Sequence, residues 1–154
     1  MFKSIICPVD FSESSANALS FALDIAQSNQ SELVVLYTYR LISGTDDKAG
    51  ANRISLKRQQ EEIANKRIEE LKKRFPEFEQ VRHTFLAEVG FINDRLAMAI
   101  EKYNVDLIVL TENIKMRLKE RWEDGDESVL ARFNCPVLLI PSKEVREETA
   151  IGSG

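Results

Sequence analysis

The sequence has few of the residues that build metal centres, disulfide frameworks or phosphate-binding loops. Its 154 residues include two cysteines, one histidine and six glycines. Cys7 and Cys135 stand far apart and form no Cys-x-x-C pair, and a single histidine cannot complete a structural zinc site. Thiols of this kind are typical of a reducing compartment, where they serve as small buried apolar residues. We therefore expect no metal and no disulfide.

Basic excess and long apolar runs are missing as well. The net charge is −4 and the isoelectric point is near 5.2, which argues against a protein that binds nucleic acid through its phosphates. The apolar run near the N-terminus is too short for a signal-peptide core or for a membrane span. The sequence predicts a cytoplasmic protein with no nucleic-acid partner and no membrane partner.

The length fits one domain. A compact chain of about 150 residues buries roughly 70% of its unfolded surface, which is enough for a core without cross-links. Hydrophobic residues at 44% and charged residues at 30% are ordinary for a globular protein. We expect a single domain over residues 1–142 and a polar, frayed tail over residues 143–154.

Strand and helix patterns alternate along the chain. Short apolar or β-branched runs predict strands at residues 4–9, 32–39, 80–86, 106–110 and 136–141. Apolar residues at steps of three and four predict helices between them, the first capped by Ser12, the third closed by Asn104 and the last starting near Asp126. Strands separated by helices favour right-handed crossovers and a doubly wound, mostly parallel α/β sheet.

The segment from Arg53 to Phe75 predicts a long, charged helix. Its inner stripe is expected to consist of Leu56, Ile63, Ile68, Leu71 and Phe75. Its basic residues would suit a nucleic acid, but glutamates are interleaved among them, as in the pair Glu70 and Arg74 one turn apart. That pattern favours a solvated helix face.

Polar residues follow several of the predicted strands. In a doubly wound sheet, ligands bind beyond the carboxyl ends of the strands, where the strand order reverses. Asp10, Thr38 and Thr111 are the polar residues nearest those ends and are the candidate ligand-binding residues. Asp10 has an alternative role, since end-of-strand aspartates often hold the next backbone turn. His83 fits a partly exposed edge position better than a catalytic one.

Motifs of known enzyme classes are missing. The sequence has no G-x-S-x-G elbow, no P-loop, no H-E-x-x-H and no plausible Cys/His pair. A receiver domain would need an acidic pair after the first strand and an aspartate ending the third, and the chain offers Asp10 alone and then "LAE". We expect no enzymatic activity and no catalytic residues.

Three segments carry a resemblance to a known family. "IICPVDFSESSANALSFALDIA" resembles the opening of the universal stress protein family, with a first strand that ends in Pro-x-Asp and a Ser-capped helix. "AEVGFINDRLAMAIEKYNVDLIVL" is similar to the family's Gly-led third helix and fourth strand, and "VLARFNCPVLLIP" to its closing helix and fifth strand. The resemblance implies a five-stranded sheet of order 3-2-1-4-5 with helices on both faces. It also implies a homodimer, commonly formed through the last strand.

Members of this family that bind ATP have a fourth strand followed by Gly-x-x-Gly and, further on, Gly-Ser or Gly-Thr. Glycines there let backbone N–H groups close on phosphates without interference from a Cβ. By resemblance, Thr111 and Ile114 take the first two glycine positions, and Gly125 or Asp124 falls near the third. The ATP pattern is broken. The resemblance also places Asp10 close to a bound nucleoside.

The residues that replace the glycines predict a helix. Ile114, Leu118 and Trp122 recur every four residues, which favours a short amphipathic helix packed over the strand ends. Four basic residues are expected on its outer faces, where they could instead hold phosphates as side-chain charges: Lys115, Arg117, Lys119 and Arg121.

The sequence thus favours a non-enzymatic, dimeric universal stress protein with weak or no ATP binding and no required cofactor. It would act by association with an unknown protein partner or by sensing a small ligand. The alternative is a member that binds ATP or AMP through a non-standard phosphate loop. "PVLLIP" is an apolar strand at an expected sheet edge, which invites pairing with another chain. We therefore expect Val137 and Leu139 at the dimer interface.

Overall fold

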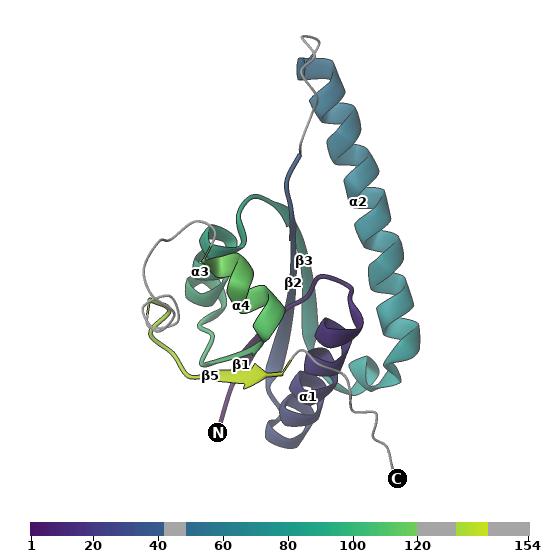
Figure 1. The fold of residues 1–154 in the computed structure, drawn as a ribbon. Coiled ribbons are helices and arrows are strands. Elements are labelled where there is room, and N and C mark those ends of the chain that lie inside the picture. Colours follow the sequence, from purple (N-terminus) through teal and green to yellow (C-terminus); the bar gives the residue numbers. More distant parts are fainter. Residues whose placement is uncertain (42–48, 120–131, 142–154) are drawn as a thin grey trace.

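The structure is a computed structural model that describes residues 1–41, 49–119 and 132–141. In it a parallel sheet is sandwiched between helices (Figure 1). The elements are β1 (Ser4–Pro8), α1 (Glu13–Asn29), β2 (Glu32–Tyr39), α2 (Ala49–Arg74), the 3-10 helix η1 (Pro76–Gln80), β3 (His83–Val89), α3 (Ile92–Tyr103), β4 (Leu107–Thr111), α4 (Glu112–Leu118) and β5 (Val137–Ile140). The helix expected from Asp126 and the tail expected over 143–154 lie outside the described residues.

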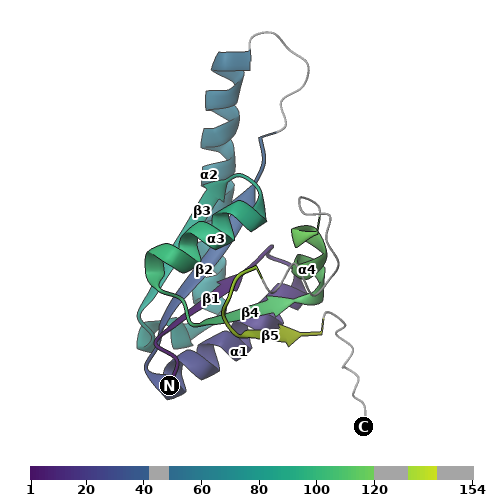
Figure 2. The same cartoon turned by 90° about the vertical axis from the view of Figure 1, so that its left-hand side faces the viewer.

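The five strands are all parallel and lie in the order β3-β2-β1-β4-β5, as predicted. Helices α1 and α2 cover one face and α3 and α4 cover the other (Figure 2). Because β1 is flanked on both sides and covered on both faces, its residues alternate between two cores. Cys7 packs with Leu19 of α1, and Ile6 packs with Leu96 of α3. This central strand carries buried residues on both faces, as the sequence indicated.

The helix ends follow the predicted capping residues. The side chain of Ser12 accepts a hydrogen bond from the backbone N–H of Ser15 at 3.2 Å and so caps α1. Asn104 adopts a left-handed conformation with φ of 53° and ends α3.

The third strand starts later than the sequence suggested. We expected it from residue 80, but residues Pro76–Gln80 form η1 and the strand runs from His83 to Val89. Pro76 stands at the first turn of η1, where proline is tolerated, and Phe78 anchors that turn by burial in the core below α1. The apolar side chain of Phe78 therefore reaches the core from a 3-10 helix and not from a strand.

The inner stripe of α2 was wrong at one position. Ile63 is 47% exposed, whereas Ala64 is fully buried and continues to Ile68 and Leu71. Residues 64, 68 and 71 follow steps of four and three, so they share a face that Ile63 misses by about one residue, or 100°. The N-terminal part of α2 projects past the other helices (Figure 1), and in that part Ile54 is 63% exposed.

Helix α4 closes the end of the sheet after β4. Ile114 and Leu118 are fully buried in the core under α3, as the four-residue spacing predicted, and Trp122 lies outside the described residues. The Thr111 hydroxyl accepts a hydrogen bond from the Ile114 N–H at 3.1 Å. The Asn93 amide of α3 donates to the Leu118 carbonyl oxygen at 2.6 Å. Both ends of α4 are therefore tied to the rest of the fold.

We predict that truncating the buried face of α4 destabilises the protein while truncating its exposed face does not. Ile114→Ala or Leu118→Ala should lower the free energy of unfolding by about 2–5 kcal/mol, because each leaves a cavity. Met116 is 60% exposed on the same helix, so Met116→Ala should change the free energy of unfolding by less than about 0.5 kcal/mol. Urea unfolding followed by circular dichroism measures all three. Equal losses at positions 114 and 116 would contradict this packing.

Candidate functional site

The candidate site lies along the edge of the sheet where the carboxyl ends of β2, β1 and β4 meet. The chain leaves β1 toward α1 on one face and leaves β4 toward α4 on the other, so the strand order reverses between these two strands. Asp10 follows β1, Thr38 stands near the end of β2, and Thr111 ends β4. The fold thus brings the three predicted residues to one edge.

Asp10 holds the turn that leads into α1. Its carboxylate accepts hydrogen bonds from the Ser12 N–H at 3.1 Å and from the Ser12 hydroxyl at 2.6 Å. Its own N–H donates to the Ser15 hydroxyl at 3.2 Å. Between them Phe11 adopts a φ of 64°, a left-handed conformation that is unusual for an aromatic residue. The predicted turn-holding role of Asp10 is confirmed.

Thr111 is buried and caps α4. In an open glycine loop, the backbone N–H groups after the fourth strand face the ligand. Here the N–H of Ile114 is occupied by the Thr111 hydroxyl, and the Ile114 side chain points into the core. This part of the loop has become the first turn of a helix.

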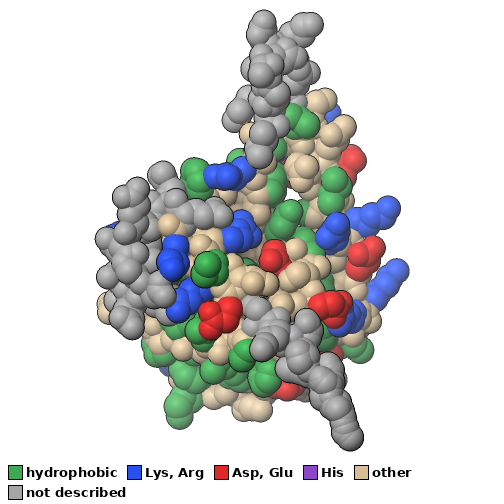
Figure 3. Space-filling view, in the orientation of Figure 1, with side chains coloured by type: hydrophobic (Ala, Val, Ile, Leu, Met, Phe, Trp, Pro, Cys, Tyr) green, Lys and Arg blue, Asp and Glu red, His purple; other side chains and the backbone are tan. Residues whose placement is uncertain are grey.

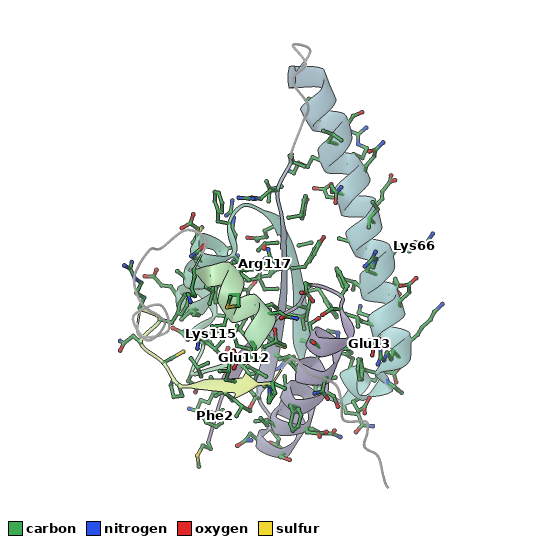
Figure 4. The ribbon with its side chains drawn as sticks, in the orientation of Figure 1. Phe2, Glu13, Lys66, Glu112, Lys115 and Arg117 are labelled. Carbon is green, nitrogen blue, oxygen red and sulfur yellow. The ribbon has the colours of Figure 1, made fainter. Side chains whose placement is uncertain are left out.

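Thr38 is also buried, and a side chain from α4 reaches it. The Arg117 guanidinium donates from Nη2 to the Thr38 hydroxyl at 3.4 Å. Figure 4 shows Arg117 on the side of α4 that faces β2, with Lys115 on a different side. Arg117 was expected on an outer face, and instead it is half-buried and spans the strand ends. The four-residue spacing of Ile114 and Leu118 predicted which face of α4 is buried. It did not predict that the long side chain of Arg117, beside that face, extends to β2.

Aromatic residues flank the same edge, and the sequence analysis did not single them out. The Phe11 and Tyr37 rings lie 4.6 Å apart, and Tyr37 stacks on Tyr39 at 5.8 Å. The Arg40 guanidinium lies 4.5 Å from the centre of the Phe91 ring. The alternation in "YTYR" is the signal that could have indicated them, since it puts both tyrosines on one face of β2.

Two side chains of types that often react, Cys7 and His83, lie in the sheet. Burial raises the pKa of the Cys7 thiol to about 12, which keeps it protonated and poorly nucleophilic at neutral pH. His83 lies on the edge strand β3, as expected, with its Nδ1 2.8 Å from the Val81 carbonyl oxygen and its ring against Phe78. Across residues 1–41, 49–119 and 132–141, no three His, Cys, Asp or Glu side chains gather in a way that could hold a metal ion.

Strand β5 forms the opposite edge of the sheet from β3. Val137 and Leu139 are half-buried against the core under α3 and α4, while Leu138 on the other face is 37% exposed and was not predicted. Ile108 donates its N–H to the Pro136 carbonyl oxygen. In a parallel ladder every second residue bonds the neighbouring strand, so the backbone groups of Val137 and Leu139 point outward, away from β4.

None of the helices in the described part of the chain is long and apolar enough to cross a membrane.

Comparisons of sequence and of structure both find proteins of the same family. Universal stress protein MJ0577 of Methanocaldococcus jannaschii is 27% identical over 161 aligned positions, which cover 93% of this chain and 97% of that protein. The solved structure of MJ0577 has a TM-score of 0.73 at 25% identity and covers 94% of this chain and 99% of its own. Universal stress protein UspA from Lactobacillus plantarum has a TM-score of 0.68 at 19% identity, covering 90% and 97%.

A more distant structure contains a nucleotide. The universal stress protein family protein At3g01520 from Arabidopsis thaliana, solved with AMP bound, has a TM-score of 0.58 at 14% identity and covers 96% of this chain and 97% of its own. At that identity the likeness shows the fold alone.

The model of the universal stress protein family matches residues 1–141. That match spans every element of the sheet, including the strand ends closed by α4. The chain belongs to the universal stress protein family.

Proposed function

We propose that this protein is a non-enzymatic, cytoplasmic, homodimeric universal stress protein that acts through protein association or by sensing a small ligand, with weak or no ATP binding. The proposal of weak or absent ATP binding rests on the structure of α4. Where ATP-binding members have a glycine loop, this chain places a helix with Ile114 and Leu118 buried beneath it. A triphosphate would have to displace a packed helix before backbone N–H groups could reach it.

The polar groups at the strand ends support the same proposal. Asp10 is bonded to Ser12, Thr38 to Arg117, and Thr111 to Ile114. A ligand that used any of these side chains would first break an internal hydrogen bond. Each such exchange returns little net free energy, because one hydrogen bond replaces another.

The charge of α2 supports a protein partner over a nucleic acid. Acidic and basic side chains alternate along the side of α2 seen in Figure 3 and do not form a continuous basic face. A nucleic-acid partner requires a concentration of positive charge that neutralises several phosphates.

A second function is favoured by one observation, the position of Arg117. Its guanidinium stands half-buried beside Thr38, on the same helix as Lys115. An arginine there could pair with a single phosphate group by its side chain, without a glycine loop. The second candidate is therefore a member that binds a nucleoside monophosphate, the class of ligand found in the Arabidopsis relative.

For Mg·ATP we predict a dissociation constant weaker than about 100 μM, equivalent to a binding free energy of less than about 5.5 kcal/mol. Titration calorimetry on the purified protein measures it directly. A dissociation constant in the low micromolar range would contradict the proposal of weak or absent ATP binding.

Titration with AMP, repeated on Arg117→Gln, separates the two candidate functions. AMP binding that is lost in Arg117→Gln, but kept in the control Lys115→Gln, would support the second candidate, a protein that binds a nucleoside monophosphate.

We also predict a homodimer whose contact includes β5. Leu139→Asp should weaken it, because a buried unpaired charge at the contact is costly. Sedimentation velocity across micromolar concentrations measures the effect. The control is Met98→Asp on α3, where the side chain is 57% exposed and contacts Arg95 on the β3 side of the sheet, opposite β5. A natural protein that stays monomeric, or equal weakening by both variants, would contradict the prediction. Thermal unfolding of the Leu139 variant checks that the protomer remains folded.

A further inference from the structure

Strand β3 is a sheet edge that lacks the usual protection against pairing. It is seven residues long, reads HTFLAEV, and is bonded on one side by β2. Edge strands are commonly protected by shortness, by proline or by lysine, and β3 has neither proline nor lysine. Its one acidic residue, Glu88, lies 3.8 Å from Arg95 of α3. The strand therefore presents a long, weakly charged edge.

The hydrogen bonds to β2 identify which backbone groups point outward. The Arg82 carbonyl accepts from Leu33, and the Gly90 N–H donates to Tyr39. Because alternate residues of a parallel strand bond the same neighbour, the even-numbered residues face β2, and His83, Phe85 and Ala87 face outward. The Val89 carbonyl confirms this alternation, since it accepts from the Arg95 Nε at 2.8 Å. That contact caps the outward edge after Ala87.

The same three residues also line a groove. A cavity of about 540 Å³ lies between β3 and α2, with the side chains of His83, Phe85 and Ala87 on one wall. The opposite wall consists of α2 residues Glu61, Asn65, Ile68, Glu69 and Lys72. Figures 1 and 2 both show α2 running alongside β2 and β3. We call this cavity the α2–β3 groove. A strand added to β3 would place alternate side chains under α2.

The charge of the groove selects the kind of segment. Lys72 lies over the Phe85 ring, with its Nζ 5.4 Å from the ring centre. Glu61 lies 3.8 Å from Lys57, but both side chains are about half exposed and such a pair contributes little. Among the charged residues that line the groove, Glu61 and Glu69 outnumber Lys72, whose ammonium lies over the Phe85 ring, so the groove has a small acidic excess that suits a basic side chain. A second copy of the chain would bring a groove of the same sign.

We infer that β3 and the α2–β3 groove bind an extended segment of another protein by strand addition. Basic side chains of that segment alternate with apolar ones. The basic residues point toward Glu61 and Glu69, and the apolar residues lie on the opposite face beside Leu86. Main-chain hydrogen bonds to His83, Phe85 and Ala87 give affinity, and the groove gives selectivity. The inference rests on the protein-association part of the proposed function and is independent of ATP binding and of the β5 dimer.

The test uses a fluorescein-labelled peptide as long as β3, in which lysine and valine alternate. Fluorescence anisotropy with the full-length protein should show saturable binding. Two N-methylated forms of the peptide separate strand pairing from charge attraction. Methylation at every second residue in one phase blocks the N–H groups that face β3, and methylation in the other phase leaves them free. One form should lose binding and the other should keep it. Equal behaviour of the two forms would overturn strand addition.

Protein variants test the groove. Glu69→Lys should weaken binding of the lysine–valine peptide roughly tenfold, because the charge reversal replaces an attraction by a repulsion at about 5 Å. Glu101→Lys makes the same charge change at an exposed position of α3, on the other face of the sheet, and should have a much smaller effect. Equal effects, or no saturable binding of the natural protein, would overturn the inference. So would a change of oligomeric state in Glu69→Lys, because the second copy would then be the occupant. A failed peptide test with an intact β5 dimer leaves the proposed function standing.

Discussion

The burial of the Ile114 side chain, on the inner face of α4, is the interaction on which the candidate site depends. It holds the residues after β4 in a helix, with the Thr111 hydroxyl bonded to the Ile114 N–H. A glycine at position 114 would supply no side chain to the core and would leave the backbone free to turn toward a ligand. With isoleucine there, hydrophobic burial and the helix cap act in the same direction. The strand ends close as a consequence of packing.

This closure changes what the neighbouring residues do. Once α4 is formed, Arg117 is carried to the end of β2 and contacts Thr38. Asp10 is already engaged by the turn into α1. Doubly wound proteins bind ligands at this end of the sheet, and here Asp10, Thr38 and Thr111 each make a hydrogen bond within the fold. In the described part of the chain, the two outer strands also present backbone groups for new contacts, because those of Leu139 on β5 and Phe85 on β3 point away from the sheet.

Much of this architecture could be predicted from local patterns, because each pattern reports a strong local energy. Buried β-branched runs predicted β2 and β4, and Ser12 and Asn104 predicted helix ends through their own side chains or conformations. The predictions failed where the outcome depends on distant parts of the chain. Ile63 is exposed because the sheet packs against the face of α2 that contains Ala64, Ile68 and Leu71, and β3 starts later because Phe78 is buried in the core from η1.

The same distinction applies to the candidate site. Spacing predicted the buried face of α4, since Ile114 and Leu118 lie one helical turn apart. Contacts between elements could not be predicted in this way. Arg74 was expected to pair with Glu70, yet its guanidinium binds the Glu13 carboxylate on α1 through two contacts of 2.9 Å. The reach of Arg117 to Thr38 is of the same kind. The partners of such long side chains lie on other elements, and only the packed fold brings those elements together.

We expect α4 to be a formed, packed helix over the strand ends both in the free protein and in the presence of nucleotide. Amide hydrogen exchange of Ile114, followed by NMR, tests it most directly. We expect slow exchange in the free protein, because this N–H is bonded to the buried Thr111 hydroxyl, and the same slow exchange after addition of excess Mg·ATP. Fast exchange at Ile114, or a marked change in its exchange rate or chemical shift on adding Mg·ATP, would show that α4 is not a packed helix that excludes the triphosphate.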